Sequence, residues 1–318
     1  MTIAWLFPGQ GSQSAGMAKD VIATFASAKR VFADADAALA GSAPTSLTTL
    51  ILEGPEDQLT LTANAQPAIV TVSAAILAAV REAHPTLPAP SFAAGHSLGE
   101  YSALVASGAL ALADAVRLVR ARGNAMQQAV APGEGAMSAV MGLEPAKVEE
   151  LCAAAAAATG QVVSCANFNA PGQIVIAGHA SAVAKAAELV SAEKGKAIPL
   201  KVSAPFHCAL MAPAAKVVAT ELDRVALSPL AFPVVANVDA KPNAERERVK
   251  ELLVRQVDGA VRWEESVRFM KDAGVTHALE LGPGKVLAGL VKRTAKEIPV
   301  LSVGDTAAIG EIPKFLGL

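Results

Sequence analysis

Residues 91–105 contain a Gly-x-Ser-x-Gly motif between a short apolar segment and a segment of apolar residues at helical spacing. This strand, turn and helix context is the one that a nucleophile elbow requires. In so tight a turn, side chains two residues before and two residues after the serine would collide, and glycine occupies both positions, 95 and 99. We therefore predict that Ser97 is a nucleophile at the apex of the turn, above a helix N-terminus that faces any oxyanion formed there. The alternative is an ordinary glycine-rich loop with a helix-capping serine.

The size and charge of the chain limit the classes of protein to consider. Its 318 residues can bury about three quarters of the unfolded surface, which suits two domains or one large one. A net charge of −2 without a basic run argues against nucleic-acid binding. The three cysteines lack metal-ligand spacing and cannot form a closed disulfide framework, so we expect a cytoplasmic protein without a bound metal.

Two long uncharged stretches, 58–80 and 151–184, raise the question of a membrane. Each contains Pro, Asn, Gln or Gly at several points, which a membrane span would tolerate only at a cost. The first residues also lack the basic region and cleavage site of a signal peptide. We expect buried core elements and no membrane association.

The order of apolar runs and helical patterns predicts an α/β fold. Ile3 to Phe7 is a continuous apolar run, typical of a strand buried on both faces of a parallel sheet. Further strands are expected in the short apolar segment that leads into the Gly-x-Ser-x-Gly motif and at 232–238, 278–281 and 300–302. Helices are expected at 17–39, 47–52, 112–126 and 263–270, with a long apolar helix opened by Pro67 and running through Ala83. The prediction is an α/β-hydrolase-like large domain with a mostly parallel sheet.

A different pattern begins near residue 134. Strands at 137–142, 162–168, 173–178 and 197–202 alternate with helices at 145–159 and 181–193. The order β-α-β-β-α-β within about 70 residues is the ferredoxin-like signature. We therefore predict an inserted ferredoxin-like small domain at 134–202, a large domain made of 1–133 and 203–318, and a cleft between them.

A catalytic serine requires a base, and His207 lies in a loop at the predicted return to the large domain. His96 adjoins the serine, and its side chain is expected to point away from the apex. No acidic residue between Ser97 and His207 suits the third position of a hydrolase triad. We therefore expect the imidazole of His207 to be oriented by a backbone carbonyl or by an amide such as that of Gln256. Cys208 is a rival nucleophile, but it lacks an elbow.

One arginine of the helix at 112–126 is expected to point inward. At about 100° per residue, Arg122 lies roughly 200° from Arg120, in the direction of Leu118 and Met126. A buried guanidinium requires a carboxylate or phosphate partner. That partner is either an anionic substrate or a structural acid.

Several motifs together resemble those of the malonyl-CoA:acyl-carrier-protein transacylase family. They are Phe-Pro-Gly-Gln-Gly-Ser-Gln at 7–13, Gly-His-Ser-Leu-Gly-Glu at 95–100, Arg122, Ala-Pro-Phe-His at 204–207 and Leu-Gly-Pro-Gly-Lys at 281–285. The resemblance covers nearly the whole chain, including the inserted domain. Cys208 departs from it, since the family often has serine after the histidine.

The resemblance implies a reaction and a role for each site residue. Ser97 attacks the thioester of malonyl-CoA while His207 takes its proton, and the backbone N–H groups of Gln10 and Leu98 form the oxyanion hole. Arg122 binds the free malonyl carboxylate, and the backbone carbonyl of Gln256 holds His207. The phosphopantetheine thiol of acyl carrier protein then accepts the malonyl group for fatty-acid synthesis. Coenzyme A and phosphopantetheine are parts of the substrates, so no cofactor is expected.

Further residues are expected around this site. Met126 is expected to contact substrate, and Phe206 to narrow the pocket against α-branched malonyl groups. Basic residues near the cleft are expected to face an acidic carrier protein, although each could equally be a solvated surface residue: Lys194, Lys196, Lys201, Lys285, Lys292 and Arg293.

Other functions remain open at this point. They are a serine thioesterase or hydrolase, the same transfer in a polyketide or malonate-decarboxylase pathway, and a non-catalytic binding module.

Overall fold

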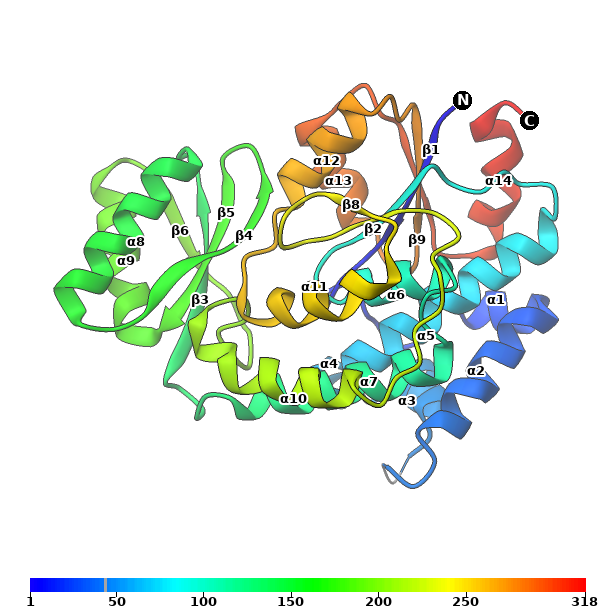
Figure 1. Cartoon of the computed structure of the whole chain (residues 1–318), viewed down its shortest axis with the longest axis horizontal. Helices are drawn as coiled ribbons and strands as arrows, with labels where there is room; N and C mark the ends of the chain where they lie inside the picture. The colour runs from blue at the N-terminus through cyan, green and yellow to red at the C-terminus, as the bar shows by residue number, and fades with distance from the viewer. Residues whose placement is uncertain (43–44) are drawn as a thin grey trace.

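A computed structural model of the chain describes residues 1–42 and 45–318, and its larger sheet has six strands in the order β10-β9-β1-β2-β7-β8 (Figure 1). All neighbouring strands are parallel except β7 and β8. The bounds are β1 Ile3–Phe7, β2 Phe92–Gly95, β7 Val234–Val235, β8 Pro242–Asn243, β9 His277–Leu281 and β10 Val300–Val303. The predicted α/β fold with a mostly parallel sheet is confirmed.

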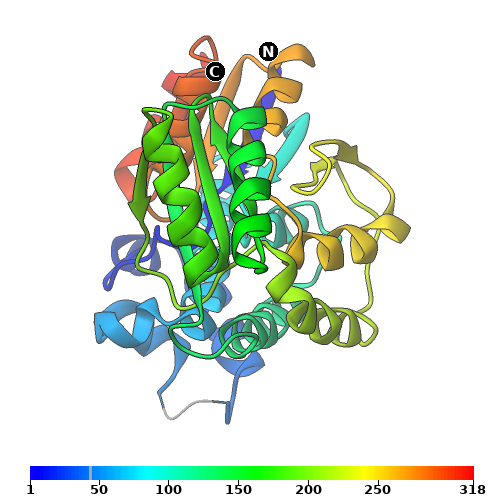
Figure 2. The ribbon, with the colours of Figure 1, turned by 90° about the vertical axis from the view of Figure 1, so that its left-hand side faces the viewer.

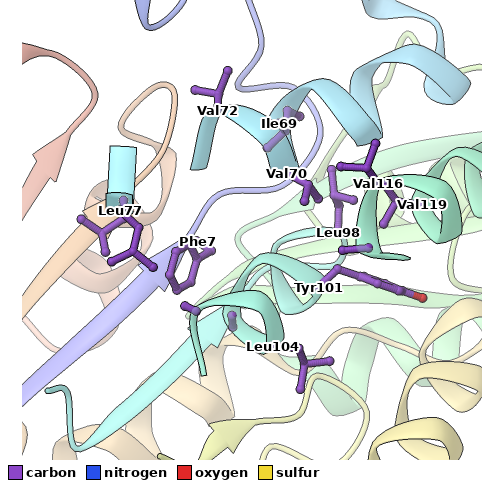
Figure 3. Close-up of a cluster of buried hydrophobic side chains, with 14 of the residues drawn as sticks. Phe7, Ile69, Val70, Val72, Leu77, Leu98, Tyr101, Leu104, Val116 and Val119 are labelled. Atoms are coloured by element: carbon purple, nitrogen blue, oxygen red, sulfur yellow. The ribbon is translucent and has the colours of Figure 1, made fainter. Parts of the chain in front are cut away.

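Helices cover both faces of this sheet, which explains why β1 is apolar throughout. Ile3, Trp5 and Phe7 belong to one buried cluster, whereas Ala4 and Leu6 belong to another. The first cluster includes residues of α2 Ala26–Ala38, α5 Thr62–Ala83, α6 Gly99–Ala106 and α7 Leu112–Gln128. Figure 3 shows side chains of this cluster from β1, α5, α6 and α7. The second includes α12 Trp263–Asp272 and α13 Val286–Thr294. Successive side chains of a strand alternate between its faces, so both faces of β1 are buried.

The remaining helices of this part of the chain also contribute buried residues to the first cluster. They are α1 Lys19–Thr24, α3 Leu47–Glu53, α4 Glu56–Thr60, a short 3₁₀ helix at Ala209–Met211, α10 Ala212–Leu222, α11 Arg246–Asp258 and α14 Thr306–Leu316. Helix α5 is long and apolar enough to cross a membrane, but 78% of its most apolar window is buried inside the protein. It is therefore accounted for as a core helix.

The second sheet is antiparallel and has the strand order β4-β5-β3-β6. Its strands are β3 Gly135–Met141, β4 Val163–Ala170, β5 Gln173–His179 and β6 Lys196–Pro199. Helices α8 Pro145–Thr159 and α9 Ala180–Ala192 pack on one face, as Figure 2 shows from that side. The other face packs against Phe206 and Cys208, next to the candidate base. This is the ferredoxin-like arrangement, although the domain limits 134–202 and 203–318 remain a prediction.

Some predicted elements differ in the structure. The helix expected at 17–39 is two helices, because the backbone at Phe25 is extended (φ −110°, ψ 122°). Pro67 does not open its helix: α5 begins at Thr62 and includes the proline in its interior. The strand expected at 232–238 shrinks to two residues, because the side chain and backbone of Asn237 bind the elbow region instead of a neighbouring strand. The small sheet ends at Pro199 rather than at 202.

Candidate active site

The turn after β2 holds Ser97 in a left-handed conformation, with φ 50°. A Cβ atom added to Gly95 would lie 1.9 Å from the carbonyl carbon of Gly99, and one added to Gly99 would lie 2.0 Å from the carbonyl oxygen of Phe7. No side chain fits at either position. The two glycines therefore permit a turn in which a non-glycine residue carries the strained backbone, as in a nucleophile elbow.

The side chain of Ser97 meets His207 at hydrogen-bond distance. Its Oγ lies 2.7 Å from Nε2 of His207, whose Nδ1 lies 2.8 Å from the backbone carbonyl oxygen of Gln256. Because a carbonyl only accepts, Nδ1 carries the proton and Nε2 is free to accept one from the serine. Burial, and then the nearby Arg122 cation, lower the pKa of His207 to about 3, so the imidazole is neutral at physiological pH.

The other four histidines of the sequence have different partners. His96 bonds Asn169, with 2.8 Å between Nε2 and Oδ1, and its ring lies against Trp263. His84, His179 and His277 lie by the carbonyl of residue 309, the N–H of residue 162 and the hydroxyl of residue 276 respectively. His207 is thus the histidine that the fold brings to the elbow serine.

Arg122 is only 1% exposed and points into the same site. Its Nη1 donates to Oε1 of Gln66 (2.9 Å), and its Nη2 donates to Oε1 of Gln256 (3.0 Å) and to Oγ of Ser97 (3.1 Å). The guanidinium also lies 5.4 Å from the ring centre of Tyr101. Burial lowers the pKa of Arg122, and the nearby Tyr101 and Glu100 side chains oppose this shift. Among the described residues the guanidinium nevertheless forms no ion pair within 4 Å, so no structural acid bonds it as the expected carboxylate partner. A buried cation held by neutral amides can receive an anionic ligand.

Two backbone N–H groups border Ser97 with no acceptor in residues 1–42 and 45–318, those of Gln10 and Leu98. The N–H of Ser97 itself is occupied, since it donates to Oδ1 of Asn237 at 2.6 Å. Gln10 and Leu98 both line the pocket that contains Ser97. They are therefore the donors that an oxyanion beside Ser97 could use.

The pocket lies where the two sheets meet, and its wall is largely apolar. Met126 and Phe206 line it, together with Met137 from the small sheet and Leu200 and Val202 from the segment after β6. Met126 is buried, and its sulfur accepts from Nε2 of Gln66 at 3.8 Å. In the described part of the chain no group of three or more His, Cys, Asp or Glu side chains is arranged to hold a metal ion. The site is built from a hydroxyl, an imidazole, a guanidinium and amides.

Two buried side chains of the site, those of Asn237 and Glu100, were given no role from the sequence, whereas Gln66 was expected to cap or to form core hydrogen bonds, with contact to substrate as the alternative. Asn237 binds the backbone of the elbow, and Oε2 of Glu100 accepts from the N–H of Asn237 (3.0 Å) and from Nε2 of Gln256 (2.9 Å). Burial raises the pKa of Glu100 to about 7. Oε1 of Gln66 accepts a hydrogen bond from Nη1 of Arg122. A signal was present for Asn237, because an asparagine within an apolar strand-like run requires a partner when buried.

A family model described as an acyl transferase domain matches residues 4–314. The chain belongs to the acyl transferase family. It is 46% identical over 308 residues to the malonyl CoA-acyl carrier protein transacylase of Bacillus subtilis (strain 168), covering 96% of this chain and 95% of the relative. It is 45% identical to the enzyme of the same name from Escherichia coli (strain K12), covering 96% and 97% of the two chains.

Solved structures of this family match the whole chain. The acyl-carrier-protein S-malonyltransferase of Bartonella henselae superposes with a TM-score of 0.94 at 45% identity, covering 100% of both chains. A malonyl transacylase solved in complex with a type II polyketide acyl carrier protein superposes with a TM-score of 0.93 at 42% identity, also over 100% of both chains. At these identities the match extends beyond the fold to the family.

Proposed function

We propose that this acyl transferase moves a malonyl group from malonyl-CoA to the phosphopantetheine thiol of an acyl carrier protein, in the service of fatty-acid synthesis. The observation that carries the proposal is the buried guanidinium of Arg122, which lies 3.1 Å from the nucleophile and has only neutral partners. A pocket for a neutral acyl group has no use for such a cation, whereas a malonyl thioester carries a free carboxylate next to its reacting carbonyl. The names of the relatives support the same substrates.

The first half-reaction forms an ester on Ser97. The hydroxyl oxygen attacks the thioester carbonyl carbon, and its proton passes to Nε2 of His207 across the 2.7 Å hydrogen bond. The carbonyl oxygen becomes an oxyanion that accepts from the N–H groups of Gln10 and Leu98. When the tetrahedral intermediate collapses, the carbon–sulfur bond breaks and the coenzyme A sulfur takes the proton from His207.

The second half-reaction reverses these steps with a different thiol. His207 takes the proton of the phosphopantetheine thiol, the sulfur attacks the ester carbonyl, and the released serine oxygen recovers a proton from His207. One thioester is broken and one is made, so the exchange requires no energy source and, we propose, no cofactor. The carboxylate on Arg122 keeps the malonyl group in place between the two steps.

The residues beside these groups have supporting roles in the proposal. Gln256 holds the Nδ1 proton of His207 with its backbone and Arg122 with its side chain, and Met126 packs beside the bound acyl group. Phe206 narrows the pocket, and we expect methylmalonyl-CoA to load more slowly than malonyl-CoA. We further propose a cytoplasmic location.

An acyl carrier protein also requires a docking surface near the pocket mouth. Lys201 is exposed and lines the pocket. Lys285 and Lys292 are exposed and border a groove between α13 and β10, and Arg293 donates to Oε1 of Gln173 on the small sheet at 2.8 Å. With Lys194 and Lys196, which are also exposed, these cations lie on both parts of the molecule. They suit a carrier protein with an acidic surface.

The test separates transfer from hydrolysis. The protein is incubated with malonyl-CoA in the presence or absence of a holo acyl carrier protein, with the Ser97→Ala variant as control. We expect rapid malonyl-carrier formation with the carrier and a persistent acyl-enzyme without it. Rapid release of free malonate in the absence of the carrier would identify a thioesterase instead.

A further inference from the structure

The buried side chain of Asn237 binds the backbone of the elbow at two points. Its Oδ1 accepts from the backbone N–H of Ser97 at 2.6 Å, and its Nδ2 donates to the backbone carbonyl of Gly95 at 2.7 Å. The amide thus binds the residue at the apex and the residue two positions before it. Asn237 has no exposed surface, so water cannot replace either bond.

The backbone of Asn237 is fixed as well. Its N–H donates to Oε2 of the buried Glu100 at 3.0 Å, and its carbonyl oxygen accepts from the N–H of Arg262 at 2.9 Å. The residue before Arg262, Val261, forms a bridge to β4 of the small sheet, with N···O distances of 2.9 Å to Ala166 and 2.8 Å from Phe168. Asn237 is therefore anchored by the first helix after the elbow and, through one residue, by the small sheet.

The anchored side chain of Asn237 also supports the strained backbone conformation of Ser97. A non-glycine residue at φ 50° persists only where its surroundings hold it, and the hydrogen bond to the N–H of Ser97 acts on that residue's own backbone. Because the same bond occupies the N–H of Ser97, that N–H is not available to an oxyanion, whereas the N–H of Leu98 is. The position of Oγ between Nε2 of His207 (2.7 Å) and Nη2 of Arg122 (3.1 Å) depends on this backbone.

We infer that Asn237 is a positioning residue that holds Ser97 in the reactive conformation by binding the elbow backbone at the apex and at the residue two positions before it. The inference rests on the proposed function, because it takes Ser97 as the nucleophile. Asparagine suits the task because it offers a donor nitrogen and an acceptor oxygen at the same distance from the main chain. An ionised aspartate at this position would present an acceptor to the carbonyl of Gly95, and alanine would leave both backbone groups unpaired.

The first experiment compares Asn237→Ala with Asn243→Ala. Asn243 is a second buried asparagine, whose side chain bonds the backbone N–H and carbonyl of Glu245 and does not touch the elbow. We measure the single-turnover rate of Ser97 acylation by malonyl-CoA, the Kd for malonyl-CoA in a Ser97→Ala background, and the Tm. A displaced nucleophile loses on the order of 100-fold in rate.

We expect Asn237→Ala to lose about 100-fold in acylation rate while its Kd changes less than threefold. Asn243→Ala is expected to lower the Tm and to keep the wild-type rate. Equal acylation rates in the two variants would overturn the inference. If the wild-type protein itself formed no acyl-Ser97, the proposed function would fail first, which is a different result.

Asn237→Asp provides a second route that does not depend on the alanine variant folding. A protonated aspartic acid has one donor and one acceptor, so lowering the pH restores the asparagine pattern. The titrating groups around this position are Glu100, Asp239 and His207, with Arg122 as a fixed cation, and wild type at each pH corrects for them. We expect the acylation rate of Asn237→Asp, relative to wild type, to rise as the pH falls. A ratio that stays constant or decreases would contradict the positioning role.

Discussion

Replacing Arg122 with glutamine should separate the reaction of malonyl-CoA from that of acetyl-CoA. In the free protein the guanidinium is 1% exposed and bonds Gln66, Gln256 and Ser97, none of which carries a charge. A malonyl carboxylate would form a buried, charge-assisted pair with this group. Acetyl-CoA has no such carboxylate, so for its reaction the substitution removes only the 3.1 Å hydrogen bond from Nη2 to Oγ of Ser97.

The size of the effect follows from the burial of the pair. Truncating one partner of a buried, hydrogen-bonded charge pair costs about 2–5 kcal/mol, and each 1.4 kcal/mol corresponds to about tenfold. We take the middle of this range, about 3–4 kcal/mol, because the carboxylate keeps partial access to solvent through the pocket mouth. The kcat/KM for malonyl-CoA should therefore fall by about 10²–10³-fold in Arg122→Gln.

The assay measures acylation of Ser97 by both thioesters in wild type, Arg122→Gln and Arg122→Lys. The lysine variant keeps the charge and loses the two-pronged geometry, so its malonyl-CoA rate should lie between the other two. Acetyl-CoA acylation by Arg122→Gln should stay within about tenfold of wild type. If both thioesters lost rate equally in Arg122→Gln, the arginine would hold the serine rather than recognise a carboxylate, and the reasoning would be refuted.

Three further outcomes are expected. Because burial and a cation lower the pKa of His207 to about 3, the base stays unprotonated as the pH falls. The kcat/KM for malonyl-CoA should therefore be flat from pH 7.5 to about 5, and a fall of kcat/KM to half its value near pH 6.5 would contradict this. Gly99→Ala should prevent stable folding, since its Cβ would lie 2.0 Å from a carbonyl oxygen of β1. Gly289 lies in the exposed interior of α13, and an added Cβ there would have nothing within 4 Å. Gly289→Ala should therefore raise the free energy of unfolding, measured by chemical denaturation, by about 0.5–1 kcal/mol. Lys285→Glu with Lys292→Glu should raise the KM for the carrier protein about tenfold and leave acylation by malonyl-CoA unchanged; an unchanged KM would place the docking surface elsewhere.

Local signals were sufficient for most of the fold. The apolar run at 3–7 predicted a strand buried on both faces. The two buried clusters that share β1 show why every residue of this run is apolar. The break at Phe25 has no such signal, because its neighbours continue the helical pattern. The strand at 232–238 was predicted too long, since hydrophobicity alone does not reveal that Asn237 bonds the elbow instead of a ladder.

The candidate site also has parts that the sequence predicted and parts that only the fold shows. The glycines around Ser97 and the placement of His207 suggested their own roles, because tight turns and domain-junction loops leave short motifs in the sequence. The network of Asn237, Glu100 and Gln256 joins residues as far as 156 positions apart, and such pairings follow from packing rather than from any local pattern. Arg122 was predicted to point inward, but its neutral partners became visible only with the fold.

The most direct test of the account is the location of the acyl group after a brief incubation with malonyl-CoA and no acceptor thiol. Intact-mass measurement and peptide mapping should find one malonyl group per chain, attached to Ser97, and none on the Ser97→Ala variant. A malonyl group on Cys208, or equal labelling of both proteins, would contradict the claim that the elbow serine carries the reaction.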